Sequence, residues 1–519
     1  MKQKLFILPI ILIYSLGIAQ QLQPDDLEYL GAFRLTDSAG TPDNVGWEWS
    51  NWSSGLTYYP YGDPEGPEDG FPGSLFGVGH DHTQYISEIS IPVPVISPEK
   101  DVNDLNTAQT LQEFQDIKGN LFNPMELPRV GLEYLPPQGS QETPKLYFAW
   151  APHLDEGAVN PSHGWCELDL ANPQSTGTWR IGDYWNYVTG DYIFSIPPAW
   201  ADVNTPNMYV ATGRFRDGGQ GSMGPSIIAY GPWIQGNPPE SGTTLTATPL
   251  LLYGNVYQEN PQTLNNYHHS DQWSGGVWLT VQDKSAVIFV GTKGEGDCWY
   301  GYADGTQWPN DQNKEGSGER GWWSGSFAGQ FLFYDTGELA AVAQGNMEVW
   351  EPQPYATLDI DECLYHIDSE QQWYHIGAAA CDRQRGLLYV MEPLADSYKS
   401  IIHVWRVTPS SAVQEKKSPD HQYRLEQNYP NPFNLKTTIV FSLPERTEVT
   451  LEIFDMSGRC INTLISEVKV SGMHRVFWNG NDLRGRTVAS GMYLYRLLIK
   501  NPASGKITFT NIRKMIITK

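Results

Sequence analysis

A pattern of short apolar runs repeats through residues 25–408 and constrains the fold of this chain more than any other feature. One unit reads GLTYYP, SLFGVGH and YISEISIP over residues 55–92. Four similar units follow, and each is separated from the next by a further strand candidate: LQEFQDI, TWRIG, TPLLLYG and YATLDI. Repeated units of β-rich runs are typical of propeller blades. The sequence therefore predicts an all-β fold, a β-propeller of about five four-stranded blades.

The fifth unit ends at Val407 without an outer strand. The run LEYLGAFRL at residues 27–35 precedes the first unit and has no unit of its own. We therefore expect this N-terminal strand to complete the fifth unit and close the ring, which also removes exposed strand edges. A β-sandwich with additional hairpins is the alternative architecture.

In this arrangement the loops divide between two faces. Links on one face are plain turns such as QDKSA and DRQRG. Links on the other face are rich in Trp, His, Asp and Arg, and they comprise residues 46–52, 79–82, 152–156, 182–187, 213–219, 265–273, 363–375 and a long loop over 294–325. Functional loops tend to gather on one rim of a rigid scaffold. We therefore expect a ligand site on this second face.

Candidate catalytic groups on this face are histidines, a carboxylate and an arginine. Imidazole and carboxylate side chains supply acid–base chemistry, and a guanidinium neutralises an anion. A hydrogen-bonded or ion-paired structural role is the alternative for each, because no spacing matches a metal or glycosidase motif. The candidates are His80, Asp81, His153, Arg214 and His268.

Candidate ligand-binding groups are mostly tryptophans, whose flat rings stack on the apolar faces of sugars. Arg214 and Arg216 could hold a carboxylate or sulfate of an acidic polysaccharide. Packing inside the sheets is the alternative for about half of the aromatic residues of this face. The candidates are Trp49, Trp52, Trp185, Arg216, Trp273, Trp299, Trp322 and Trp323.

Three function classes follow for residues 25–408. The first is a carbohydrate-active enzyme, either a glycoside hydrolase with two carboxylates or a polysaccharide lyase acting on uronates with His or Tyr as base and Arg beside the acid group. The second is a non-catalytic propeller that binds a glycan or a surface. The third is a structural surface protein. Fold alone does not choose among them.

Charge is distributed unevenly along the chain, whose formal net charge is −25. From residue 424 onward, 14 Lys/Arg and 7 Asp/Glu give +7, which leaves −32 for the residues before it. An acidic body of this kind repels a phosphate backbone, which excludes nucleic acid as a partner.

Metal and redox signals in the sequence are few. Residues 304–316 are rich in Asp and Asn and could hold calcium, although they do not match an EF-hand loop, and no other cofactor is indicated. The five cysteines lack a CxxC pair. Cys363 and Cys381 could form a disulfide in an oxidising compartment, with free thiols as the alternative.

Residues 1–19 have the layout of a secretory signal peptide. Lys2 and Lys4 precede the run LFILPIILIYSLGIA, and small residues precede a cleavage site near Ala19. A transmembrane anchor is the alternative, but the run is shorter than the roughly 20 residues that span a bilayer. We therefore expect an exported protein without a transmembrane anchor.

Residues 409–423 are polar and predict a linker. After them, short strands alternate apolar and polar residues: TTIVFSL, EVTLEIFD, HRVFWNG, GMYLYRLLIK, KITFTN and RKMIITK. About six strands in residues 424–519 suit a small β-sandwich of immunoglobulin-like type.

This tail resembles a known family. NYPNPFN, TTIVFSLPE, IFDMSGR and WNGNDLRGRTVASGMYLYRL are similar to the C-terminal sorting domain of type IX secretion cargo of Bacteroidota and related phyla, over almost all of residues 424–519. Leu435 stands where a proline often follows PFN. The resemblance implies the type IX machinery as a partner and passage through the periplasm and outer membrane. It further implies removal of the tail, with release or attachment at the cell surface. For residues 25–408, the expected ligand is an extracellular glycan.

Overall fold

The computed structural model divides into two compact units, Met1–Ser410 and Ser411–Lys519, which are described separately. The described residues are 20–36, 54–63, 66, 70–80, 83–122, 129–151, 159–215, 223–255, 258–260, 262–309, 316, 320–367, 372, 374–408, 423–425, 428, 431–434, 436–443, 447–469, 472–500 and 506–518. The signal peptide predicted at residues 1–19 and nearly all of the linker predicted at residues 409–423 lie outside them.

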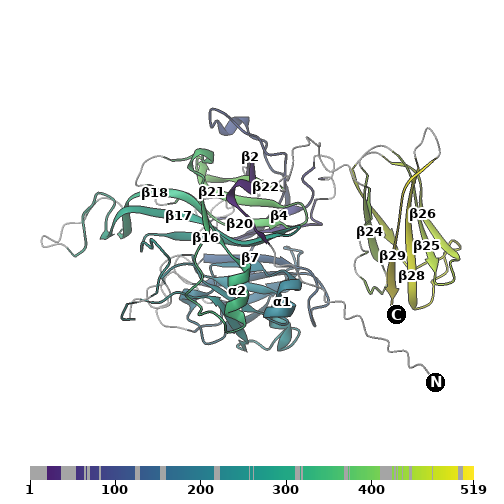
Figure 1. Ribbon diagram of the computed structural model, residues 1–519, viewed down its shortest axis with the longest axis horizontal. Coiled ribbons are helices and arrows are strands. Elements are labelled where there is room, and N and C mark those ends of the chain that lie inside the picture. The colour runs from purple at the N-terminus through teal and green to yellow at the C-terminus, as the bar shows by residue number, and fades with distance from the viewer. Residues whose placement is uncertain are drawn as a thin grey trace, which may run out of the picture. The chain divides into compact units, whose positions relative to one another are not determined.

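Five mainly antiparallel sheets follow one another along the first unit, which is drawn from purple to green in Figure 1. Sheet 1 contains β3 (Leu56–Tyr59), β4 (Ser74–Val78), β5 (Ile86–Ser90) and β6 (Thr110–Gln115). Sheet 2 contains β7 (Arg129–Leu135), β8 (Lys145–Ala151), β9 (His163–Cys166) and β10 (Thr176–Ile181), and β14 (Thr244–Leu245) extends it. Sheet 3 contains β11 (Tyr192–Ser195), β12 (Val210–Gly213), β13 (Ile227–Tyr230) and β15 (Ala247–Leu251).

The remaining two sheets use both ends of the unit. Sheet 4 contains β16 (Gln272–Val281), β17 (Lys284–Gly301), β18 (Gly321–Tyr334) and β19 (Ala356–Asp359), and β1 (Gln20–Gln21) pairs with the start of β17. Sheet 5 contains β20 (Ala379–Asp382), β21 (Leu387–Asp396), β22 (Lys399–Val407) and β2 (Leu27–Arg34). Every run expected as a strand in residues 25–408 therefore forms one, in the expected order.

Apolar side chains fill the spaces between successive sheets. Along β4, Leu75 packs against sheet 5 and Phe76 packs against sheet 2, because neighbouring residues of a strand point to opposite faces. The same pattern places a separate core cluster between each sheet and the next, and another between sheet 5 and sheet 1. The first strand of each sheet also contacts the first strand of the next sheet, in the order β3, β7, β11, β16 and β20, and β20 in turn contacts β3. Burial on both faces explains why these strands read as continuous apolar runs.

The N-terminal strand β2 pairs with β22 from Leu27 to Arg34, which makes it the outer strand of sheet 5 as expected. Side chains reinforce this pairing. The Tyr29 hydroxyl lies 2.8 Å from His403 Nδ1, and His403 Nε2 lies 2.7 Å from Glu392 on β21. Arg34 Nε donates to Asp396 at 2.9 Å. The first described strands are thus held to the last strands of the same unit by both backbone and side-chain bonds.

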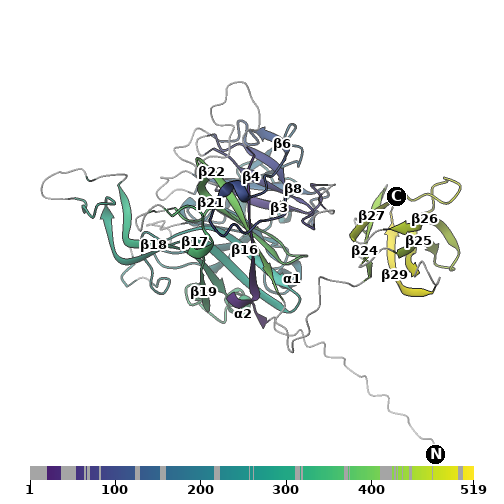
Figure 2. The ribbon, with the colours of Figure 1, turned by 90° about the horizontal axis from the view of Figure 1, so that it is seen from above.

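One region differs from the sequence prediction. Residues 294–301 and 321–325 of the segment expected as a loop form the outer part of the β17–β18 hairpin, which projects from the sheets in both views (Figures 1 and 2). Trp299 pairs across the hairpin with Trp323, and Tyr300 pairs with Trp322. Cross-strand aromatic pairs stabilise a hairpin even where glycines and charged residues interrupt the apolar pattern.

Two short helices were also not predicted from the sequence. The helix α1 (Pro198–Asn204) begins with proline, whose missing N–H costs nothing at that position. Asp335 caps α2 (Thr336–Ala343) by accepting from Gly337 N at 2.6 Å. Trp200 of α1 donates to Thr336 O at 3.0 Å, so the two helices adjoin.

The second unit consists of two antiparallel sheets around one core. One sheet contains β23 (Arg424–Leu425), β24 (Thr437–Leu443) and β27 (Gly472–Trp478), and the other contains β26 (Cys460–Lys469), β25 (Thr447–Asp455), β28 (Gly491–Lys500) and β29 (Ile507–Ile517). Both contribute to a single apolar cluster. The sequence analysis missed β26, and it divided β29 into two strands. Alternating burial along β25 and β28 matches the expected pattern.

Candidate functional site

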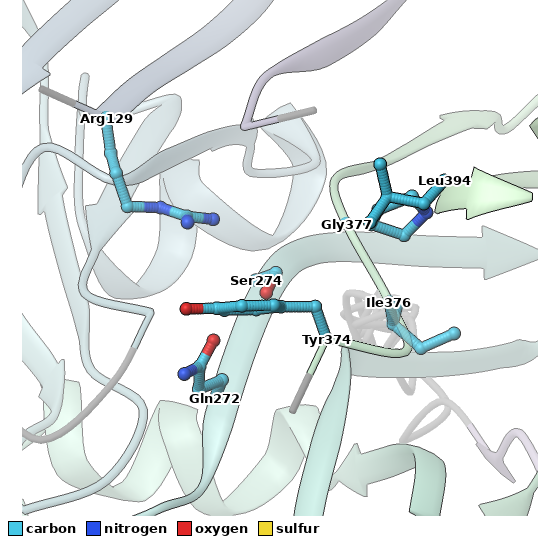
Figure 3. A pocket seen from close by; sticks show the side chains of 8 residues that line it. Arg129, Gln272, Ser274, Tyr374, Ile376, Gly377 and Leu394 are labelled. Carbon is cyan, nitrogen blue, oxygen red and sulfur yellow. The ribbon is translucent and has the colours of Figure 1, made fainter. Parts of the chain in front are cut away.

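A cavity of about 180 Å³ opens where the first strands of sheets 2 and 4 begin, which is the end of the sheets that carries the loops singled out in the sequence (Figure 3). Arg129 starts β7, and Gln272 and Ser274 belong to the start of β16. Tyr374 lies on the segment that leads into β20. The cavity is lined by Arg129, Gln272, Ser274, Tyr374, Ile376, Gly377, Pro393 and Leu394.

Arg129 is the cationic side chain of this cavity. Its guanidinium lies 3.8 Å from the centre of the Phe215 ring, in a cation–π contact. The guanidinium of Arg214 lies 5.4 Å from the same centre, and its Nε is 3.3 Å from Asp191 Oδ2. Asp191 also accepts from Phe215 N at 3.1 Å. This arrangement fixes the ring against which the Arg129 guanidinium rests.

Tyr374 connects the cavity to the β17–β18 hairpin. Besides lining the cavity, it packs against a small cluster of Trp323 and Phe327, to which Trp299 also belongs. Figure 3 shows the side chains of Arg129 and Tyr374 reaching into the cavity from opposite sides. A cation from β7 and a phenol from the segment that leads into β20 therefore face the same space.

Next to the cavity, His375 is buried and built into the framework. Its backbone N–H donates to Thr292 Oγ1 at 2.9 Å, and its Nδ1 lies 3.3 Å from Asp361 Oδ1. Asp361 in turn accepts from Gly329 N at 2.6 Å. These bonds hold the segment on which Tyr374 lies.

His268 belongs to a polar cluster at the start of sheet 4. Its Nδ1 lies 2.9 Å from the Ser324 hydroxyl, and its backbone N–H donates to Asp271 at 3.1 Å. Lys293 donates to both oxygens of Asp271, at 2.8 and 3.0 Å. Burial, with Lys293 and His269 nearby, lowers the pKa of His268, so its imidazole is neutral at pH 7. Burial raises the pKa of Asp271, although Lys293 opposes that shift.

The structure separates the predicted catalytic residues. Arg214 is 1% exposed and ion-paired with Asp191, so its guanidinium belongs to the interior rather than to an open site. His80 is partly buried and follows β4, and it does not line the cavity. Asp81 and His153 lie outside the described residues. His163, the first residue of β9, is buried, which lowers its pKa to about 3.

The predicted aromatic residues divide in the same way. Trp273 is completely buried in the core between sheets 3 and 4, so its ring offers no face to a ligand. Trp323 is also buried, whereas Trp185 and Trp299 are partly exposed. Trp322 stacks on His269 with ring centres 4.2 Å apart. Trp49, Trp52 and Arg216 lie outside the described residues.

A second polar group lies toward the opposite ends of the first strands. It is formed by Glu133, Thr57, Ser195 and Arg383 and is here called the axial network. Glu133 of β7 accepts from Thr57 of β3 at 3.0 Å and from the backbone N–H of Ser195 of β11 at 2.9 Å. Arg383, which follows β20, donates to the Ser195 hydroxyl at 2.5 Å and to the carbonyl of Trp278 in β16 at 2.6 Å. All five first strands therefore join one network.

The described residues give little support for a metal site or for a disulfide. Among them, no three His, Cys, Asp or Glu side chains gather as a metal site requires. Part of the calcium candidate at residues 304–316 lies outside them. All five cysteines are free thiols, so the Cys363–Cys381 disulfide is not formed.

Sequence reasoning missed Arg129, Gln272 and Tyr374. Arg129 directly precedes the apolar run VGLEYL, and Tyr374 directly precedes HIGAAA, so each lies at the beginning of a predicted first strand. That position, rather than the residue type, is the signal that could have found them.

Comparisons with known proteins identify the tail. The family model of the secretion system C-terminal sorting domain matches residues 427–508, which confirms the resemblance found in the sequence. No curated protein matches the chain. In the described part of the chain, no helix combines the length and apolar character that crossing a bilayer requires.

Several solved structures have some likeness to the chain. The extracellular domain of a hybrid two-component system from B. thetaiotaomicron is 9% identical, with 95% of this chain and 60% of that one covered and a TM-score of 0.27. A second such domain from this organism is 10% identical, with 95% and 58% covered and a TM-score of 0.25. Dimeric latent PorU from Porphyromonas gingivalis is 9% identical, with 80% and 36% covered and a TM-score of 0.17.

This chain spans no more than 60% of the length of those structures, and with TM-scores below 0.5 they carry no weight for its fold or function. The match to the tail stands independently of them. Residues 427–508 are a secretion-system sorting domain, and the protein is a cargo exported to the cell surface or the extracellular space.

Proposed function

We propose that residues 25–408 form a five-bladed β-propeller that binds an extracellular polysaccharide at the cavity lined by Arg129 and Tyr374. Five consecutive sheets, the cyclic order of their first strands and the pairing of β2 with β22 support the propeller. The axial network supports it as well, because it joins all five first strands. Residues 1–19 would be the signal peptide, residues 409–423 the linker, and residues 424–519 an immunoglobulin-like sandwich.

The class of ligand is inferred from a cation and a phenol that face one cavity in an acidic protein. The residues before 424 carry a formal charge of −32, which repels polyanions in general. Arg129 offers a local site for one carboxylate or sulfate, held in place by Phe215. Gln272 and Tyr374 supply hydrogen-bonding groups, and Ile376 and Leu394 supply apolar surface, as in other small-ligand sites.

The same pair of residues favours a uronate lyase as a second candidate. In such a reaction a base removes the proton on C5, the C4–O bond breaks, and a C4–C5 double bond forms while the leaving oxygen takes up a proton. Tyr374 would act as the base, and Arg129 would stabilise the carboxylate as charge develops on it. The non-catalytic binding protein needs only the contacts and no proton transfer.

A polysaccharide panel separates these functions. Each polymer is incubated with the full-length protein, and binding, new reducing ends and the ultraviolet absorbance of unsaturated uronates are measured. A uronate polymer that is cleaved by the wild type but only bound by Tyr374→Phe would establish the lyase. Binding without any product would establish the non-catalytic protein. Retention of all binding by Arg129→Ala would refute the cavity as the ligand site.

A further inference from the structure

The sorting domain contains the same turn twice. DMSGR at residues 455–459 joins β25 to β26, and DLRGR at residues 482–486 lies between β27 and β28. In each turn the first Asp donates its N–H to the carbonyl of the final Arg, at 3.0 and 2.8 Å. In each, the glycine donates to the carbonyl of that Asp and has a positive φ, +83° at Gly458 and +73° at Gly485. Only glycine adopts this conformation without strain.

The side chains repeat as well as the backbone. Asp455 accepts from the N–H of Ser457 and of Arg459, both at 3.0 Å, and Asp482 accepts from the N–H of Arg484 and of Arg486, both at 2.9 Å. In each turn the final Arg then binds the same Asp through Nε, at 3.0 and 3.1 Å. Both turns are therefore rigid before any partner arrives.

Each turn presents the same pair of groups to solvent. The residue after the Asp is a large apolar side chain, Met456 in one turn and Leu483 in the other, with 61% and 65% of its surface exposed. The Arg side chains are 77% and 69% exposed. Apolar side chains presented in this way on a rigid frame are typical of contact surfaces.

The two turns lie side by side. Leu483 N donates to Ile461 O at 3.0 Å, and the Asn462 side chain donates to Asn481 O at 2.8 Å. These bonds join the strand that follows the first turn to the segment that begins the second. Two apolar residues and two arginines thus form one surface, here called the twin-turn surface and defined by Met456, Arg459, Leu483 and Arg486.

We propose that the twin-turn surface is where the export machinery recognises this cargo, through a partner surface with apolar pockets bordered by carboxylates. The sorting-domain match at residues 427–508 includes both turns, and the tail carries +7, so an acidic partner is complementary to it. Duplication gives two equivalent contacts on one rigid frame, which strengthens binding beyond that of either turn alone.

The test measures export of the full chain from a bacterium that carries this secretion system. Met456→Ser with Leu483→Ser removes the exposed apolar groups and leaves every hydrogen bond of the turns in place. We expect the exported fraction to fall about tenfold, as when two central contact residues are truncated. Ile507→Ser with Ile512→Ser is the matched control, since these residues are 52% and 55% exposed on β29 of the same unit. It should be exported normally.

A second variant tests the charged half of the surface. Arg459→Gln with Arg486→Gln should also reduce export, while Arg459→Lys with Arg486→Lys should retain more of it. Thermal unfolding of each purified full-length variant shows whether the fold is intact. Normal export of the folded Ser or Gln variants would overturn the proposal. So would normal export with altered self-association or altered protease resistance, which would assign the surface to a second copy or to the acidic body of the same chain.

Discussion

The two ends of the five first strands use polar side chains in opposite ways. At one end, Glu133, Thr57, Ser195 and Arg383 bind one another in the axial network. At the other end, Arg129, Gln272 and Tyr374 face a cavity. Polar groups that bind one another in the interior stabilise a fold, whereas polar groups that line a cavity can contact a ligand. The comparison predicts that substitutions at the first end change stability and that substitutions at the second change binding.

The largest expected effect is on stability at the network end. Arg383→Ala removes the donors to Trp278 O and Ser195 and leaves Glu133 without its neighbouring cation. We expect the free energy of unfolding to fall by about 3 kcal/mol, measured by chemical denaturation. Gln384→Ala is the control in the same turn, because Gln384 is exposed and only its backbone N–H bonds to Asp382. Equal stability of the two variants would contradict the assignment.

A smaller effect is expected on binding at the cavity end. Arg129→Ala should weaken an anionic glycan ligand by about 2 kcal/mol, roughly thirtyfold, with little change in melting temperature. Lys145→Ala is the control, because it also removes one positive charge. Lys145 lies on β8 opposite Leu135, which is at the other end of β7 from Arg129. Equal loss of affinity in both variants would show that net charge, and not the cavity, governs binding.

The smallest effect is a pH dependence of stability at the network end. Burial raises the pKa of Glu133, although Arg383 opposes the shift. The folded state therefore binds a proton more tightly than the unfolded state, and stability falls as pH rises from the unfolded pKa of about 4.3 through the folded one. Glu133→Gln should remove this slope, which is at most about 1.4 kcal/mol per pH unit. An unchanged slope in denaturation measured from pH 4 to 8 would exclude Glu133 as its source.

The strands of the first unit were predictable because both of their faces are buried. Runs such as SLFGV and IIHVW need no alternation to be recognised, and the turns between them are rich in glycine and proline. The outer part of the β17–β18 hairpin was not predictable in this way. Its sequence GEGDCWYG breaks the apolar pattern, and its stabilising partners lie on the other strand.

The candidate site was less predictable than the fold. Trp273 and Arg214 are residue types typical of binding sites, but packing between sheets 3 and 4 buries the first, and Asp191 binds the second. Arg129 and Tyr374 carry no motif. They face one cavity because Arg129 begins β7 and Tyr374 lies on the segment that leads into β20, at the same end of the sheets. That relation is set by the assembled sheets rather than by local sequence.

The pairing of β2 with β22 has a consequence for synthesis and quality control. Leu27 is translated long before its partner Val407, which is made only shortly before the tail. A chain that terminates early leaves β2 without its partner strand and sheet 5 incomplete. The molecules able to complete sheet 5 are therefore those translated almost to the sorting domain. The molecules that can complete the first unit are thus the same full-length molecules that carry the sorting domain.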